Sequence, residues 1–310
     1  MNCLILTELF WPEGSGAELA TYLYAKLLSR RGVDVTVLTG SLRRMMWQGE
    51  GFQIVPWALS VKPRTKYSSL LLASNLVREP YRTLIKKADV VYISKCCWAI
   101  PPVRNLGRPV VIGVHEYSPV CPTATLYNCA SKTVCNGCNW LSCLKCVLLH
   151  ENEEVRSLGE RFLSPLLNTT FGQIYGKFLS QADAVVFVSK YQRETIVKHM
   201  SHISDKSHVV YNPVPVFQED GVEGEDYGFY GGCSAPKGFS VLLEALRNLC
   251  KPVKVHVAGR MDKGLMVDSP LLMYHGWLGP QAYHDLLKST IATIFPSICP
   301  EPSPYVVVES

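Results

Sequence analysis

The chain alternates short apolar runs with longer stretches in which apolar residues recur every three to four positions. The short runs are typical of strands buried in a parallel sheet, and the longer period is typical of amphipathic helices. Leu19, Leu23 and Leu27 predict a helix over 17–31 that stops at Gly32. The alternation as a whole predicts an α/β fold. Strands are expected at 2–6, 33–38, 90–93, 110–114, 184–188, 209–211, 228–230, 253–258, 271–274 and 291–295.

The rhythm breaks at 212–226, where two prolines, two glycines and five acidic residues occur in fifteen positions. This composition is typical of a linker. We therefore predict two Rossmann-like, doubly wound domains, residues 1–213 and 214–310. The length of 310 residues agrees with two domains of ordinary size.

Membrane spans and export signals are not expected from the hydropathy pattern. No stretch approaches eighteen uninterrupted apolar residues, and no basic region precedes the first apolar run. These features predict a cytoplasmic protein. Its twelve cysteines are then expected to stay reduced.

Charge is distributed unevenly along the chain. Residues 1–215 hold 24 Lys and Arg against 15 Asp and Glu, whereas 216–310 hold 7 against 11. Much of the basic excess lies in 43–95. Together with four of the six aromatic residues of this region, it forms a mixture that suits anionic lipid headgroups at the inner face of the cell membrane. A solvated basic face is the alternative, and no nucleic-acid partner is predicted. The four aromatic residues are Trp47, Phe52, Trp57 and Tyr67.

Three loops follow predicted strands, at the sheet edge where open α/β folds bind ligands. In EGSGAE, Gly14 and Gly16 allow close approach of a ligand, and the helix that follows directs its N–H groups at an anion. His115 ends the VVIGV strand, where a structural role competes with a catalytic one. In GGCSAPKG, two glycines and Lys237 resemble a phosphate cradle.

Together with PEPSPYVVVES at 300–310, these segments resemble family 4 glycosyltransferases, which are retaining enzymes of the two-domain GT-B fold. The similar segments occur in the family's order: LTELFWPEGSGAELATYL, VVIGVHEY, AVVFVSKYQRE, VVYNPV, FYGGCSAPKGFSVLLEAL and IFPSICPEPSPYVVVES. The last of these carries Glu301 and Glu309 with seven residues between them. The resemblance covers nearly the whole chain.

The resemblance implies a role for individual residues. Glu301 would accept hydrogen bonds from donor-sugar hydroxyls, Glu309 would bind the ribose, and Lys237 would hold the donor diphosphate. His115 would lie beside the reacting sugar, and Gly14 and Gly16 would line the acceptor side near the phosphates. The remaining donor contacts would come from Gly259, Arg260, Trp277, Leu278, Ser303 and Tyr305.

Three departures from the family pattern are visible. Gly232 stands where an arginine is common, so Lys237 would carry more of the diphosphate charge. Pro304 replaces a usual glycine and removes one backbone donor. Glu309 is expected to open a helix, and the second domain is expected to be incomplete, because the family continues with further strands and helices.

Six of the twelve cysteines lie in CPTATLYNCASKTVCNGCNWLSCLKC, an insertion at 121–146 in the first domain. Two Cys-x-x-Cys pairs can supply four thiolates to a structural zinc ion. An iron–sulfur cluster and buried thiols without metal are the alternatives. The proposed ligands are Cys135, Cys138, Cys143 and Cys146, and Cys121 or Cys129 could replace one of them.

The sequence thus predicts a retaining glycosyltransferase, of the hexosyltransferase type, that uses a nucleotide-diphosphate sugar. A glycan, a lipid-linked molecule or a small molecule would be the acceptor, as in polysaccharide biosynthesis. No cofactor is expected in catalysis. The retaining step could proceed by front-face attack or by double displacement, for which no nucleophile is evident. A nucleotide-sugar epimerase is the second interpretation, and an inactive chain that binds metal or a partner through the cysteine insertion is the third.

Overall fold

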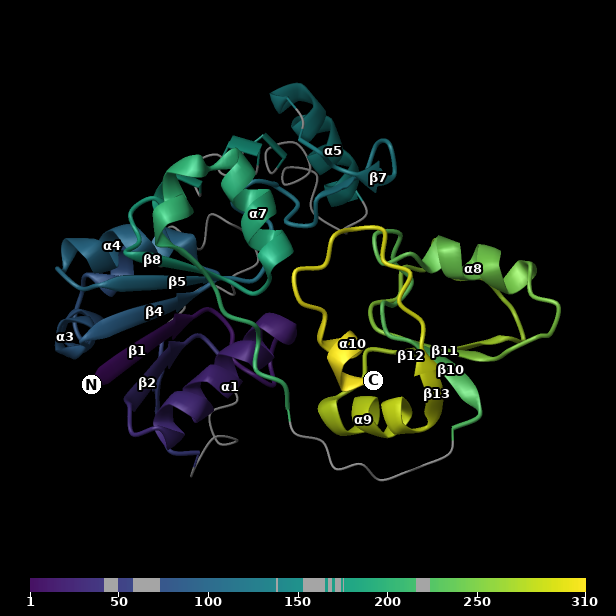
Figure 1. The fold of residues 1–310 in the computed structure, drawn as a ribbon, viewed down its shortest axis with the longest axis horizontal. Coiled ribbons are helices and arrows are strands. Elements are labelled where there is room, and N and C mark those ends of the chain that lie inside the picture. The colour runs from purple at the N-terminus through teal and green to yellow at the C-terminus, as the bar shows by residue number, and fades with distance from the viewer. Residues whose placement is uncertain are drawn as a thin grey trace. The chain divides into compact units, whose positions relative to one another are not determined.

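The computed structural model divides the chain into two units (Figure 1). Unit 1 comprises Met1–Ala124 and Asn139–Pro213, and unit 2 comprises Thr125–Cys138 and Val214–Ser310. The break after Pro213 lies in the proline-rich segment at which the sequence analysis divides the chain. Placing Thr125–Cys138 in unit 2 differs from the predicted division, which keeps the whole cysteine insertion in the first domain. The structure describes residues 1–41, 50–57, 73–137, 139–152, 165–166, 169–170, 174, 176–215 and 224–310.

Unit 1 is built on a parallel sheet with the strand order β3-β2-β1-β4-β5-β8-β9. Ile5 of β1 lies opposite Val37 of β2 on one side and Tyr92 of β4 on the other. The direction of strand addition reverses between β1 and β4, so their carboxyl ends form the switch point where such sheets bind ligands. The strands are β1 (Asn2–Thr7), β2 (Asp34–Thr39), β3 (Gln53–Pro56), β4 (Val90–Ser94), β5 (Val110–Val114), β8 (Ala184–Phe187) and β9 (Ser207–Val209).

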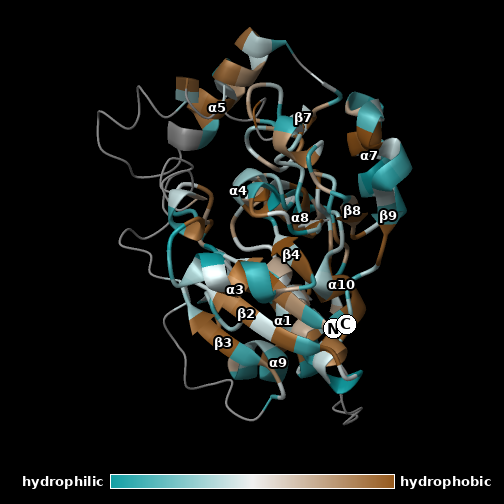
Figure 2. Ribbon diagram, turned by 90° about the vertical axis from the view of Figure 1, so that its left-hand side faces the viewer, coloured by the Kyte–Doolittle hydropathy of each residue, from teal (hydrophilic) through white to brown (hydrophobic). Residues whose placement is uncertain are grey.

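Helices connect these strands, as the periodicity predicts. In α7, Gln192 and Ile196 are buried one turn apart, and Figure 2 shows hydrophobic and hydrophilic segments alternating along this helix. Two short strands, β6 (Tyr127–Asn128) and β7 (Thr133–Val134), form an antiparallel hairpin in the cysteine segment. The helices are α1 (Gly16–Arg30), α3 (Tyr81–Lys87), α4 (Ile100–Asn105), α5 (Trp140–Asn152) and α7 (Lys190–His199), with 3-10 turns η2 (Cys97–Ala99) and η3 (Ser201–Lys206).

Of the aromatic residues assigned to a membrane-facing surface, Trp57 is instead buried in unit 1 and Phe52 is half-buried against its core. Trp57 is only 3% exposed and its ring lies 5.5 Å from that of Trp98. Phe52 packs edge-on against Phe10, with ring centres 5.9 Å apart. Burying a large aromatic ring fully stabilises the fold by about 1.5–3 kcal/mol relative to leaving the ring in water. Trp47 and Tyr67, the other two aromatic residues of that prediction, lie outside the described residues.

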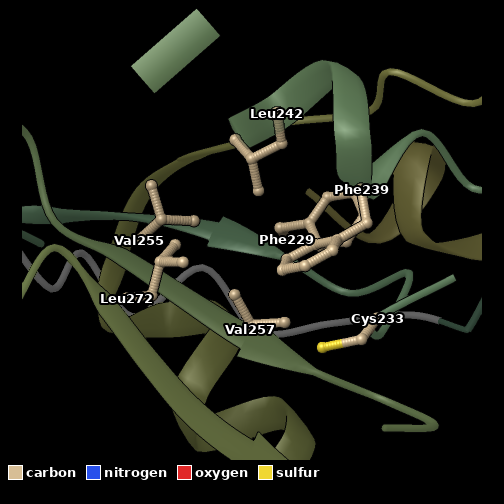
Figure 3. Close-up of a cluster of buried hydrophobic side chains, with 7 residues drawn as sticks. All are labelled: Phe229, Cys233, Phe239, Leu242, Val255, Val257 and Leu272. Carbon is tan, nitrogen blue, oxygen red and sulfur yellow. The ribbon is translucent and has the colours of Figure 1, made fainter. Parts of the chain in front are cut away.

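Unit 2 contains a four-stranded parallel sheet in the order β12-β11-β10-β13. Its core lies between strands β10 to β12 and helix α8, where Phe229 and Phe239 pack 6.0 Å apart (Figure 3). The strands are β10 (Asp226–Phe229), β11 (Val255–Ala258), β12 (Leu272–Gly276) and β13 (Thr290–Thr293), and the helices are α8 (Phe239–Arg247), α9 (Pro280–Lys288) and α10 (Tyr305–Glu309).

The α/β prediction is confirmed, and the expected strands are found with small shifts. The largest shift is at β9, which ends at Val209, whereas the strand was expected over 209–211. Strand β3 was missed, because QIVP is short, begins with a polar residue and ends in proline at the sheet edge. In the described part of the chain, no helix has the length and hydropathy needed to cross a membrane.

Candidate functional site

The loop between β10 and α8 holds Lys237 beside a carboxylate from the far end of unit 2. The Lys237 ammonium forms an ion pair with Oε1 of Glu301. The side chain of Lys237 is 41% exposed and that of Glu301 is 15% exposed. Two residues that the sequence assigns to one donor site are therefore in direct contact, 64 positions apart in the chain.

Two further side chains surround the Glu301 carboxylate. The Ser297 hydroxyl donates to Oε1 at 3.1 Å, and the Cys299 thiol lies 3.6 Å from the same oxygen. Cys299 is buried, and burial raises the pKa of its thiol above the ordinary value, so it remains protonated and can donate. The sequence analysis missed both residues, although their spacing from Glu301 on one short loop was a usable signal.

The Glu301 loop is tied to the Lys237 loop through the backbone. The amides of Ile298 and Cys299 both donate to the carbonyl of Pro236, at 2.9 and 3.1 Å. Each such bond contributes about 0.5–1.5 kcal/mol net. The two loops are thereby held together at the residues next to the ion pair, so its partners are positioned before any ligand arrives.

Glycines in this region serve contacts within the protein. A Cβ on Gly232, at φ +64°, would lie 2.2 Å from the carbonyl oxygen of Arg260. A Cβ on Gly238, at φ +79°, would lie 2.0 Å from the carbonyl oxygen of Pro296. Gly259, at φ +123°, faces the backbone of Gly232 across the contact between the Gly232 and Arg260 loops. The close approach that these glycines permit in the structure is between neighbouring loops, and their contact with a ligand stays a prediction.

The other predicted donor contacts are spread over unit 2. The backbone carbonyl of Arg260 accepts from Cys233 at 2.9 Å, next to the Lys237 loop. Trp277, after β12, is 72% exposed, and Leu278 beside it is half-buried. Ser303 is half-buried in the loop after Glu301, and Tyr305 begins α10.

Glu309 lies at the end of α10, which begins four residues earlier, so the expectation that it opens a helix is wrong. The Tyr283 hydroxyl of α9 donates to its Oε2 at 2.7 Å. Burial raises the pKa of Glu309, and the Tyr283 bond acts against this rise. Glu309 is thus positioned by α9 and not by the ion pair at Glu301.

In unit 1, His115 follows β5 as predicted, and the residue is half-buried. Both ring nitrogens are buried and neither has a hydrogen-bond partner in the described part of the chain. Burial, and then the positive charge of Lys95, lower the pKa of His115 to about 4. The imidazole is therefore neutral at physiological pH, and its two nitrogens do not reach solvent in this conformation.

In the glycine loop of unit 1, the position expected for a bound anion is taken by the carboxylate of Glu18. The Glu18 carboxylate accepts from the Ser15 amide at 2.7 Å and from the Ser15 hydroxyl at 3.1 Å, which forms a capping box at the start of α1. A Cβ on Gly14 would lie 2.5 Å from Cγ of Glu18, and Gly14 has φ +102°. Gly14 therefore makes room for Glu18, while Gly16 is the first residue of the helix.

A lysine that the sequence analysis did not single out lies at the switch point of unit 1. Lys95 follows β4 with φ 66°, a conformation that costs a non-glycine residue about 1–2 kcal/mol. Its ammonium lies 3.0 Å from Oε1 of Glu18. Burial acts to lower the pKa of Lys95, but the charges of Glu116 and Glu18 outweigh it and raise the pKa. A lysine directly after an apolar strand was the signal that could have identified it.

Lys95 lines a cavity of about 170 Å³ at the carboxyl ends of β1, β4 and β5. The wall includes the carboxylates of Glu8, Glu18 and Glu116. Glu8 accepts from the indole nitrogen of Trp98 at 2.9 Å. The site therefore combines one ammonium group with three carboxylates at the place where the topology predicts a ligand.

The cysteine segment carries its predicted ligands on three different elements. Cys129 lies in the turn between β6 and β7, Cys135 follows β7, and Cys143 and Cys146 lie three residues apart on α5. The Cys121 thiol lies 3.2 Å from the Thr123 hydroxyl. Cys138 lies outside the described residues. Among the residues that are described, no group of three or more potential ligands is arranged to hold a metal ion.

Comparison with known proteins defines the class of this one. The sequence pattern of Glycosyltransferase Family 4 matches residues 14–216, more than half of the chain. The chain belongs to this family. A search of curated proteins finds no match.

Solved structures show the same fold at low sequence identity. HepE of Anabaena, solved in complex with UDP-glucose, matches with a TM-score of 0.64 at 14% identity, covering 100% of this chain and 77% of its own. WaaG, a glycosyltransferase involved in lipopolysaccharide biosynthesis, gives 0.59 at 15% identity, with 99% and 78% covered. A glycosyltransferase from Rickettsia africae ESF-5 gives 0.59 at 14%, with 99% and 76% covered. The chain therefore has the GT-B fold of two Rossmann-like domains and spans about three quarters of the length of these proteins.

Proposed function

We propose that this protein transfers a sugar from a nucleotide-diphosphate sugar to a hydroxyl-bearing acceptor, with retention of the anomeric configuration. The observation that carries the proposal is the Lys237–Glu301 pair at the carboxyl end of β10. It joins a cation suited to a diphosphate and a carboxylate suited to sugar hydroxyls. Support also comes from the family and from HepE, whose structure contains UDP-glucose.

In the proposed mechanism, the diphosphate approaches the exposed ammonium of Lys237. An ammonium group has three donor hydrogens, so Lys237 can contact phosphate oxygens while it stays near Glu301. Its charge would stabilise the leaving diphosphate as the glycosidic bond breaks. Glu301 would accept hydrogen bonds from hydroxyls of the donor sugar, with Ser297 fixing one of its oxygens.

Two further roles follow from the same resemblance. Glu309 would accept from the ribose hydroxyls while Tyr283 orients its carboxylate. His115 would act near the acceptor only after a rearrangement that exposes a ring nitrogen, since both nitrogens are buried here. A sugar of the hexose type as donor, a glycan or lipid-linked acceptor, and a cytoplasmic location stay predictions of the sequence. A membrane-surface location would rest mainly on the basic residues, because Trp57 is buried and Phe52 is half-buried.

Titration calorimetry with UDP, GDP and their sugar conjugates tests the proposal. We expect one of these nucleotides to bind, and Lys237→Met to weaken its binding by about 1.5–3 kcal/mol, the size of a charged hydrogen bond. Lys251→Met, which removes an exposed lysine outside the loop, is the matched control and should leave the affinity unchanged. Equal affinities in wild type and Lys237→Met would refute the role of Lys237.

We further propose a structural zinc ion in the cysteine segment, held by Cys135, Cys138, Cys143 and Cys146. Elemental analysis of the purified protein should find about one zinc per chain, and a chelator should lower the melting temperature. Cys143→Ser should lose the metal, whereas Cys250→Ser, at an exposed cysteine elsewhere, should keep it. Metal-free protein that melts at the same temperature with and without chelator would exclude the site.

A further inference from the structure

Strand β5 contains a glycine, Gly113, that lies beside Tyr92 and His115. A Cβ on Gly113 would lie 2.0 Å from the hydroxyl oxygen of Tyr92 and 3.3 Å from Nε2 of His115. A glycine inside a strand commonly marks such a close approach. Any larger residue at this position would displace the end of the Tyr92 side chain. Gly113 therefore allows the Tyr92 hydroxyl and the His115 imidazole to lie close together.

The strand register places both side chains on one face of the sheet. Tyr92 of β4 is paired with Val111 of β5. Gly113 and His115 follow Val111 at intervals of two residues, and side chains at this spacing in a strand lie on the same face. Helix α1 contacts this face through Tyr24, whose ring centre lies 6.0 Å from that of Tyr92. The Tyr92 hydroxyl and both ring nitrogens of His115 are buried there.

These buried polar atoms have no hydrogen-bond partner among the residues that the structure describes. The charged groups that act on His115 are Lys95 and Glu18, and these two are hydrogen-bonded to each other at 3.0 Å. A buried polar group that makes no hydrogen bond is unfavourable. The Tyr92 hydroxyl and Nε2 of His115 are close enough for one water molecule to bridge them, because water bonds to each partner at about 2.7–3.0 Å.

Resting on the function proposed above for His115, we propose that Tyr92 is a positioning residue. Its hydroxyl, through one bridging water, holds the imidazole in the tautomer that carries hydrogen on Nδ1. The hydrogen bond made by one ring nitrogen decides which of the two nitrogens carries the hydrogen. His115 then meets a bound sugar as a neutral hydrogen-bond donor at Nδ1, once a rearrangement exposes that nitrogen.

The direction of the hydrogen bond follows from the chemistry of the two groups. Burial raises the pKa of Tyr92, so its hydroxyl keeps its hydrogen, and the pKa of His115 is lowered to about 4, so one ring nitrogen is free to accept. A phenol is a stronger acid than the N–H group of a neutral imidazole, and its oxygen is a weaker acceptor than an imidazole nitrogen. Tyr92 therefore donates toward Nε2, and Nδ1 keeps the hydrogen.

Nitrogen-15 NMR of the full chain, labelled in its eight histidines, reads the tautomer directly. The His115 signals are assigned by their loss in His115→Gln. In the wild type at pH 7.5, Nδ1 should be the protonated nitrogen. Tyr92→Phe should lower the ratio of the Nδ1–H form to the Nε2–H form by about 3- to 10-fold, the equivalent of one hydrogen bond. Tyr24→Phe, which removes the hydroxyl of a half-buried tyrosine packed on Tyr92, is the matched control and should leave the ratio unchanged.

Protonation of wild-type His115 mainly at Nε2 would overturn the inference, and this measurement needs no variant. An unchanged ratio in Tyr92→Phe would also overturn it, and so would equal changes in Tyr92→Phe and Tyr24→Phe, which would indicate an effect of packing. The spectra require neither donor nor acceptor. Failure of the nucleotide titration at Lys237 would therefore refute the proposed function and leave the tautomer result in place.

Discussion

Each unit contains a lysine–glutamate pair that joins distant parts of the sequence, and the two pairs differ in how firmly they are held. In unit 1, Glu18 is enclosed and also caps α1 through Ser15, so the pair with Lys95 is part of the scaffold. In unit 2, Lys237 is 41% exposed, and Glu301 is held by short polar contacts on one loop. The lysines are similar in exposure, at 31% for Lys95 and 41% for Lys237, so the enclosure and the helix-capping role of Glu18 make the difference.

The largest effect should come from the enclosed pair. Glu18→Gln removes the carboxylate that is hydrogen-bonded to the Lys95 ammonium and weakens the capping box, so unit 1 should lose about 2–4 kcal/mol of unfolding free energy. Urea unfolding followed by tryptophan fluorescence reports mainly on unit 1, because five of the six tryptophans lie in residues 1–213. Glu194→Gln, at an exposed position on α7, is the control and should change the unfolding free energy by less than about 0.5 kcal/mol. A loss no larger than this control would show that the two pairs do not differ as we argue.

Lowering the pH should reduce the stability of unit 1 through protonation of His115. The unfolded imidazole takes up a proton near the ordinary histidine pKa of 6.5, whereas the folded one does so only near pH 4. Its contribution to the stability of unit 1 is therefore complete above pH 6.5 and is lost as pH falls toward 4, by about 2–3 kcal/mol at about 1.4 kcal/mol per pH unit. Glu18, whose pKa is lowered, adds a loss at the acidic end of this range.

Replacing His115 shows how much of the pH dependence of the unfolding free energy comes from its imidazole. His115→Gln should flatten the fall in unfolding free energy between pH 6.5 and 4, whatever it does to stability at pH 7. His208→Gln, at an exposed position on β9, should retain the full slope. Parallel slopes in the two variants would mean that the buried ring does not control the acid response.

The strands of both sheets could be predicted because buried parallel strands leave a local signal. Val110–Val114 is apolar throughout, and the structure places β5 over the same residues. Strand β3 could not be found in this way, because it is an edge strand with a short, mixed pattern. The shift of β9 has a similar cause, since the apolar run extends past the last paired residue, Val209.

The two ion pairs differ in predictability for a physical reason. Lys237 and Glu301 each lie in a segment that resembles a known family motif, so the sequence assigned them to one site before their contact was seen. Lys95 follows β4 and Glu18 lies in the first turn of α1, 77 positions away, and only the sheet order brings β1 and β4 together. Periodicity carries no information about such a pairing. The packing of Gly232 against the backbone of Arg260 could not be predicted either, because the two residues are distant in sequence.

A smaller effect on stability, with a specific effect on binding, is expected at the exposed pair. Glu301→Gln should change the unfolding free energy of unit 2 by no more than about 1 kcal/mol, as for partly exposed ion pairs. It should weaken binding of a nucleotide sugar by about 1.5–3 kcal/mol and leave the free nucleotide nearly unaffected, because the carboxylate is assigned to the sugar. Calorimetry with the nucleotide and its sugar conjugate measures the difference. Equal losses for both ligands would place Glu301 at the diphosphate instead.

The smallest effect should come from Tyr283→Phe, which removes one hydrogen bond to the half-buried Glu309 and should cost unit 2 about 1 kcal/mol. Because burial raises the pKa of Glu309, its ionised form is the unfavourable one in the folded state, and the Tyr283 hydroxyl stabilises that form. The loss should therefore be larger at pH 8 than at pH 5, where the carboxyl is closer to protonation. Calorimetric unfolding at the two pH values measures it, with Tyr227→Phe, a change on the other face of the sheet, as control. A loss independent of pH would show that the hydroxyl acts through packing and does not orient a carboxylate.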